Sequence, residues 1–216
     1  MTFESNNALL ARPAKQGLYD PTNEKDSCGV GFVADMKGRP SHAIVREADH
    51  ILTRMDHRGG CGCEANTGDG CGILTAMPHS FFGKQAKQVF GIDLPAAGQY
   101  AVGNVFLPQD AVERAKCKQV IADIIAGQNQ QLIGWRQVPV EPKKADVGPT
   151  ALRSMPFIEQ LFIGAVGVTG DAFERQLYII RKMASHTLRN DQSLAQRQSF
   201  YICTLSSKVI VYKGML

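Results

Sequence analysis

The sequence predicts an α+β domain, because predicted strands fall in clusters and predicted helices separate those clusters. Two observations carry this prediction. Short alternating or β-branched runs recur along the chain, and longer runs with apolar residues at helical spacing lie between them. The chain has 216 residues, of which 44% are hydrophobic, and this is enough for one globular domain with a core.

The first part of the chain predicts a leader, a strand, a helix and a loop. Residues 1–27 are polar and irregular, which is typical of a removable or loosely held leader, and the alternating residues 28–35 predict a strand. Apolar side chains at helical spacing predict a helix over 47–55, which ends before a pair of glycines. A loop rich in Gly, Asn and Asp follows at 59–70, and a second strand is predicted over 73–77.

The rest of the chain repeats this alternation of strands and helices. Asp171 is a predicted N-cap for the helix with the clearest amphipathic pattern. The predicted elements are strands at 100–107, 131–138 and 158–168, helices at 110–126 and 171–188, a loop with four prolines at 139–156, and a hairpin formed by 200–205 and 209–212 around Ser206-Ser207.

Composition excludes several classes of partner. The 24 basic and 20 acidic residues give a net charge of +4, and the longest basic run is Lys143-Lys144, so we expect no nucleic-acid partner. Apolar runs are too short to span a membrane, and the N-terminus lacks the pattern of a secretory signal. We therefore expect a cytoplasmic chain whose six cysteines stay reduced.

Cys28 is the first candidate for chemistry, in the stretch Ser27-Cys28-Gly29-Val30-Gly31-Phe32. A free thiol has a pKa of about 8.5 and needs a base to become a good nucleophile. If the chain is cut before Cys28, the new α-amino group has a pKa of about 7.7–8.0 and can accept the thiol proton. The alternative from this stretch alone is a buried structural cysteine at the start of a strand.

Three further stretches strengthen the catalytic interpretation: Gly17-Leu18-Tyr19-Asp20-Pro21, the run from Leu52 through His57-Arg58-Gly59-Gly60, and Thr67-Gly68-Asp69-Gly70-Cys71-Gly72-Ile73-Leu74. With Cys28 and the closing stretch from Phe200 to Leu216, their order resembles the start of the large subunit of glutamate synthases. In that family the N-terminal domain is a class II glutamine amidotransferase, one of the N-terminal nucleophile hydrolases. The resemblance covers the chain from about Gly17 to Leu216.

The resemblance implies a fold and a reaction. The fold would be an αββα sandwich, C-terminally incomplete here, with residues 1–27 as a propeptide and 28–216 as a partial amidotransferase domain. Cys28 would be the nucleophile and, after cleavage, its α-amino group the base, while Arg58 would brace the site. The reaction would hydrolyse glutamine to glutamate and ammonia, for transfer to 2-oxoglutarate in glutamate biosynthesis.

The resemblance also implies partners and cofactors. The FMN and the 3Fe-4S cluster of the family belong to the synthase part, so we expect no cofactor in this chain. Partners would be glutamine as substrate, the synthase domain and its electron donor.

Arg58, His57 and the glycine turn can also be interpreted without a catalytic role. Arg58 could be a cation at a helix C-terminus, and His57 is interpreted as a structural hydrogen-bonding residue. The turn Gly68-Asp69-Gly70 could hold a phosphate, but it lacks the ending of a P-loop and precedes a strand. We expect instead a tight turn beside the active site, in which glycine allows positive φ.

A metal site is a further alternative, built on His57, Cys61, Cys63 and Cys71. The spacing departs from paired Cys-x₂₋₄-Cys units, so we expect no metal.

The chain ends at Leu216, before the positions where the resemblance implies three substrate-binding features. These are an arginine for the glutamine carboxylate, an Asn-Gly pair for the oxyanion and an aspartate for the amine. Loss of one oxyanion donor costs about 10²–10³ in rate. We therefore expect a fragment with impaired activity, and the alternative function is a non-catalytic binding or assembly module.

Overall fold

The structure, a computed structural model, describes residues 15–18, 20, 29–55, 64, 67–68 and 70–214. Its elements are α1 (His42–Arg54), β1 (Cys71–Ala76), α2 (His79–Phe90), β2 (Tyr100–Leu107), α3 (Ala111–Gly127), β3 (Gln131–Gln137), α4 (Pro149–Ser154), β4 (Phe157–Gly164), α5 (Gly170–Asn190), β5 (Tyr201–Ile202) and β6 (Val209–Gly214). A short 3₁₀ turn at Arg197–Ser199 precedes β5.

The described strands form two antiparallel sheets. The larger has the order β3-β4-β2-β5, in which Tyr100 pairs with Gly164 and Leu107 with Phe157. The smaller contains β1 and β6, with Cys71 opposite Gly214 and Ala76 opposite Val209.

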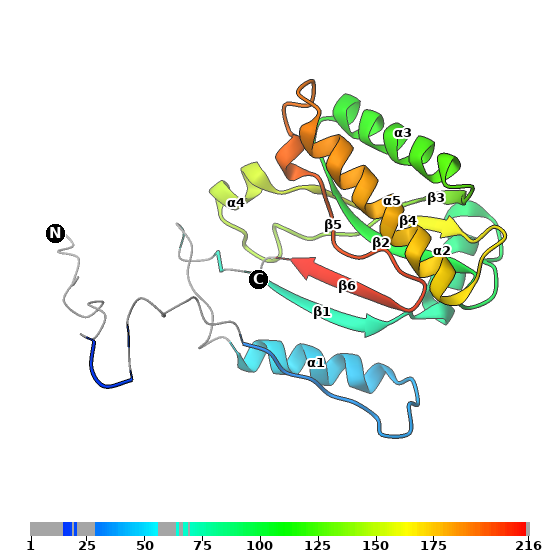
Figure 1. Cartoon of the computed structure of the whole chain (residues 1–216). Helices are drawn as coiled ribbons and strands as arrows, with labels where there is room; N and C mark the ends of the chain where they lie inside the picture. The colour runs from blue at the N-terminus through cyan, green and yellow to red at the C-terminus, as the bar shows by residue number, and fades with distance from the viewer. Residues whose placement is uncertain are drawn as a thin grey trace.

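Helices α3 and α5 cover one face of the four-stranded sheet (Figure 1). Alternate side chains of the central strand β2, Ala101, Val105 and Leu107, point to these helices and are fully buried. The helix side of this core comes from the apolar stripes of α3 and α5, including Ile121 and Leu177. This layer contains the larger of the two hydrophobic clusters.

The other face of the four-stranded sheet packs on the smaller sheet and on α2. Tyr100 and Val102 of β2 join Phe162 of β4 and Ile210 of β6 in a second buried cluster. Phe82 of α2 stacks edge-on against Phe162, with ring centroids 5.5 Å apart. Helix α1 lies on the far side of β1 and β6, so the order of layers is helices, sheet, sheet, helix (Figure 1). This is the αββα arrangement of an N-terminal nucleophile hydrolase.

Side chains from the larger sheet cap one edge of β6. The Val211 N–H donates to Thr204 Oγ1 at 3.0 Å, and the Val211 carbonyl accepts from Asn104 Nδ2 at 2.7 Å. These bonds satisfy polar backbone groups on the side of β6 that faces away from β1.

The α+β prediction is confirmed, and several predicted elements match closely. The strand predicted over 100–107 has those bounds, and the two long predicted helices correspond to α3 and α5. The N-cap of α5 is Thr169 rather than Asp171, which lies in the first turn.

Three predictions about elements were wrong, those for residues 28–35, 139–156 and 200–212, and helix α2 was not predicted. The segment 200–212 is not a hairpin, because β5 pairs with β2 whereas β6 pairs with β1 in the other sheet. Residues 29–35 pair with no strand among the residues that the structure describes. Helices α2 and α4 were missed, the first because no helical pattern was recognised at 79–90 and the second because prolines dominate its surroundings.

Candidate functional site

The extended segment 29–35 and helix α1 form an antiparallel pair. A turn near Met36–Ser41 reverses the chain, so the segment runs back along the helix (Figure 1). Gly31 lies against Ile51 so closely that a Cβ at residue 31 would stand 2.6 Å from Ile51 Cγ2. Glycine is therefore required at position 31, where the segment contacts the helix. Because the pair is antiparallel, Gly29 and Arg54 lie at the same end of it.

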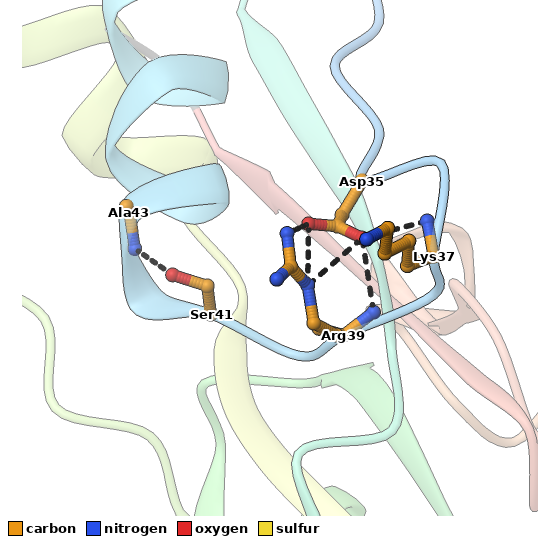
Figure 2. A network of polar contacts seen from close by, with 5 residues as sticks. All are labelled: Asp35, Lys37, Arg39, Ser41 and Ala43. Carbon is orange, nitrogen blue, oxygen red and sulfur yellow. Dashed lines mark hydrogen bonds and ion pairs between the residues drawn. The ribbon is translucent and has the colours of Figure 1, made fainter.

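The turn is fixed by the carboxylate of Asp35, as Figure 2 shows. Asp35 Oδ1 accepts from the backbone N–H of Lys37 at 2.8 Å and of Arg39 at 3.3 Å. The Arg39 guanidinium completes the network, with Nη2 2.8 Å from Asp35 Oδ2, and it holds the pKa of Asp35 below its ordinary value. Ser41 then caps α1, since its Oγ accepts from the Ala43 N–H at 3.1 Å.

The start of β1 and the end of β6 lie at the same end of the molecule as the C-terminal end of α1 (Figure 1). Cys71 begins β1 opposite Gly214 near the end of β6. At Gly72 a Cβ would stand 2.8 Å from the carbonyl oxygen of Tyr212, so this position needs glycine for close strand contact. Just before β1, Gly70 has a φ of +88°, a conformation open to glycine, and Gly68 is half-buried.

Glu64 and Thr67 fasten the chain before β1 to the start of α4. The Thr150 N–H donates to Glu64 Oε1 at 2.7 Å, and the Gly148 N–H donates to Thr67 Oγ1 at 3.3 Å. The Thr67 hydroxyl donates to Glu64 Oε2 at 3.2 Å, and the Thr67 N–H donates to the Glu64 carbonyl at 3.1 Å. We call this set of four residues, Glu64, Thr67, Gly148 and Thr150, the Glu64 anchor.

The Glu64 anchor was not predicted from the sequence. The run Gly148-Pro149-Thr150 did carry a helix-start signal, because proline is favoured in the first helical turn. No signal in the sequence pairs that start with a glutamate 86 residues away.

The predicted catalytic residues Cys28 and Arg58 lie outside the described residues. The same holds for Asp69 in the predicted turn, and for His57, Cys61 and Cys63 of the metal alternative. Their roles stay predictions, and the described geometry bears on them only through the chain segments on either side.

The described thiols are poor candidates for a nucleophile. Burial raises the pKa of Cys117 and that of Cys203 to about 11 each. Burial and the nearby carboxylate of Asp49 raise the pKa of Cys71. These three cysteines are therefore protonated at neutral pH, in contrast to the activated thiol that acyl transfer requires.

Among the described residues, no three His, Cys, Asp or Glu side chains gather in a way that could hold a metal ion. No helix in the described ranges is long and apolar enough to cross a membrane.

The chain belongs to the class II glutamine amidotransferases, because the model of that family matches residues 28–216. Within the family it is similar to glutamate synthases. It is 43% identical over 206 residues to the glutamate synthase [NADPH] large chain of Bacillus subtilis, covering 94% of this chain and 13% of the relative. It is 39% identical over 213 residues to the glutamate synthase [NADH] of Schizosaccharomyces pombe, covering 95% of this chain and 10% of the relative.

A third relative is the ferredoxin-dependent glutamate synthase 1, chloroplastic/mitochondrial, of Arabidopsis thaliana. The identity is 39% over 208 residues, which cover 95% of this chain and 12% of that protein. The chain thus spans only 10–13% of the length of these relatives.

Proposed function

We propose that residues 28–216 form a glutamine-hydrolysing domain of the glutamate synthase type, and that residues 1–27 are a leader removed to expose Cys28. The observation that carries the proposal is the antiparallel pairing of segment 29–35 with α1. The family match supports the boundary, because it begins at residue 28.

Chain lengths support a common location for Cys28 and Arg58. Three residues separate Gly31 from Cys28, about 10 Å of extended chain. From Ile51, which contacts Gly31, the helix rises about 1.5 Å per residue to Arg54, and four more residues reach Arg58. Both paths start from the same end of the pair, which supports the proposal that Cys28 and Arg58 act on one substrate.

The first half of the reaction needs a thiolate and an acceptor for its proton. The α-amino group of Cys28 takes the proton from Sγ, and the thiolate adds to the side-chain carbonyl carbon of glutamine. The C–N bond then breaks, the proton passes to the amide nitrogen, and ammonia leaves. A γ-glutamyl thioester remains on Cys28, and the cation of Arg58 supports the charged site.

The second half releases glutamate. Water loses a proton to the α-amino group and adds to the thioester carbon, and the C–S bond breaks. The proton returns to the sulfur, which restores Cys28 and its amine. No electron transfer takes part, so this domain needs no redox cofactor for hydrolysis.

In a full-length enzyme of this type, the ammonia passes to a synthase domain that aminates 2-oxoglutarate. FMN and the 3Fe-4S cluster belong to that synthase domain. The relatives are named for NADPH, NADH and ferredoxin, so the family uses more than one electron donor. The residues of this chain do not indicate which of these donors its full-length enzyme uses. A reducing compartment, which we take to be the cytoplasm, keeps the Cys28 thiol free.

A second candidate is a non-catalytic assembly module. The observation in its favour is that Val30 and Phe32, two and four positions after Cys28, are 89% and 90% exposed. Exposed apolar side chains are typical of a surface that another part of the protein covers. This candidate predicts binding without turnover.

Intact mass after treatment with an electrophilic glutamine analogue distinguishes the two. The proposal predicts a mass for residues 28–216 plus one adduct, mapped to Cys28. Cys28→Ala should keep its leader and take no adduct. Cys117→Ala is the matched control, because it removes a thiol of high pKa from the far layer, and it should label as the parent does. An unmodified mass for residues 1–216 would refute the proposal and favour the assembly module.

A further inference from the structure

The Glu64 anchor joins two segments that are far apart in the chain. Glu64 lies between Arg58 and the turn at residues 68–70 in the sequence, whereas Gly148 and Thr150 start α4. The Glu64 carboxylate accepts from the Thr150 N–H, and the Ala151 N–H also lies within its reach. Thr67 is 92% buried between the two segments, being only 8% exposed, so the anchor is packed as well as hydrogen-bonded.

Gly148 makes room for this carboxylate. A Cβ at residue 148 would overlap Glu64 Oε2 and would stand 2.8 Å from Thr67 Oγ1. Gly148 is itself buried, and the half-exposed Glu64 keeps its bond to the Thr150 N–H only while its carboxylate stays against Gly148. The contact therefore fixes the position of Glu64 as well as its orientation.

We propose that Glu64 is a positioning residue for glutamine hydrolysis: it fastens the chain between Arg58 and the glycine turn to the N-terminal turn of α4. This inference rests on the proposed function. Glu64 lies between two parts of the family motifs, Arg58 and the turn that begins at Gly68, so holding Glu64 in place would limit the movement of both. A displacement of about 1 Å in such a site costs on the order of 10²-fold in rate.

The chain contains a matched control for Glu64. Glu113, in the first turn of α3, also accepts from two loop N–H groups, those of Ala195 at 2.8 Å and Gln196 at 2.9 Å. It ties the loop after α5 to α3, in the layer of the molecule farthest from α1. Glu113→Gln and Glu64→Gln therefore remove a charge from the same kind of carboxylate cap, and only the second acts at the proposed site.

The experiment compares the parent chain with Glu64→Gln, Glu64→Ala and Glu113→Gln. The readouts are the second-order rate of Cys28 labelling by the electrophilic glutamine analogue and the rate of its alkylation by iodoacetamide. We expect Glu64→Ala to lower labelling by the analogue at least tenfold, with a smaller loss in Glu64→Gln, which keeps one acceptor oxygen. Alkylation by iodoacetamide should stay within twofold, because the thiol is unchanged, and Glu113→Gln should match the parent in both.

Equal labelling rates in the parent and Glu64→Ala would overturn the inference. So would an equal loss in Glu113→Gln, because this would show a general loss of stability. Hydrogen exchange at the Thr150 and Gly148 amides gives a readout that does not depend on activity, and it should accelerate in Glu64→Ala alone. If the parent itself takes no analogue, the proposed function fails and the positioning role falls with it, while the exchange data still report whether the anchor exists.

Discussion

At the scale of single residues, carboxylates that cap distant backbone groups recur in this molecule. Glu64 accepts from Thr150, Glu113 from Ala195 and Gln196, and Glu174 of α5 from the N–H and hydroxyl of Ser207. Hydrogen bonds to charged groups are the stronger class, and each of these joins a loop to a helix or to another loop. These carboxylates add to the backbone hydrogen bonds that also hold the loops of the fold.

The Glu64 anchor should weaken in acid. The N–H of Thr150 lowers the pKa of Glu64 below its ordinary value of 4.5. A carboxyl with a lowered folded pKa contributes stability that is complete above its unfolded pKa and is lost as the pH falls through its folded pKa. We therefore expect the thermal stability of the parent and of Glu64→Gln to differ at pH 6 and to converge below pH 4.5.

Carboxyl NMR can check the same prediction directly. The Glu64 signal should titrate below 4.5 in the folded chain, because the Thr150 N–H stabilises the charged carboxylate. A Glu64 midpoint at or above 4.5 would show that the bond to Thr150 does not form in solution.

The residue scale also shows where sequence reasoning about the site stops. The resemblance selects Cys28, Arg58 and the glycine turn, because motif order is local information. It misses Glu64, because the meaning of that residue depends on Thr150, 86 positions later. The need for glycine at positions 31 and 148 could not be predicted from the sequence either, because only the three-dimensional contacts of Gly31 and Gly148 show that a side chain does not fit.

At the scale of elements, periodicity predicts what one segment can do by itself. The strand at 100–107, which is buried on both faces, follows from a run of mostly apolar residues, and helices α3 and α5 follow from apolar residues at helical spacing. The predicted 200–212 hairpin fails because Ser206-Ser207 turns the chain from one sheet into the other, a choice made by packing. Segment 29–35 alternates like a strand, but a strand also needs a neighbour to pair with.

The N-cap of α3 gives a test at this scale. Asp110 accepts from the N–H groups of Val112 at 2.9 Å and Glu113 at 2.8 Å. Asp110→Ala should lower the free energy of unfolding by about 1 kcal/mol, measured by urea denaturation. Asp123→Ala is the control on the same helix, where the carboxylate bonds only an exposed glutamine side chain. A loss in the control equal to that in Asp110→Ala would contradict the capping role.

At the scale of the whole molecule, the helical layers on the two sides of the sheets differ in how much of their apolar surface is buried. The cluster between the four-stranded sheet and α3 and α5 is closed on both sides. Beyond the smaller sheet, α1 has no fully buried side chain, and Val30, Phe32 and Leu74 are exposed. The layer of α1 and segment 29–35 therefore buries fewer apolar side chains than the layer of α3 and α5.

We expect the chain to self-associate through the exposed apolar side chains of segment 29–35. The double variant Val30→Ser/Phe32→Ser should reduce binding of a hydrophobic dye and lower the apparent mass in solution. Its melting temperature should change little, because these side chains are already exposed. Val112→Ser, at an exposed position on α3 in the opposite layer, is the control and should leave association unchanged. Association that persists in the double variant would show that another surface is responsible.

The capped edge of β6 has a consequence for how the smaller sheet can grow. Asn104 and Thr204 occupy the Val211 backbone groups, so a further strand cannot add on that side. Within the described residues β1 pairs only with β6, so its other edge faces no described strand. The smaller sheet can therefore be extended at one edge only, and any further strand must pair with β1.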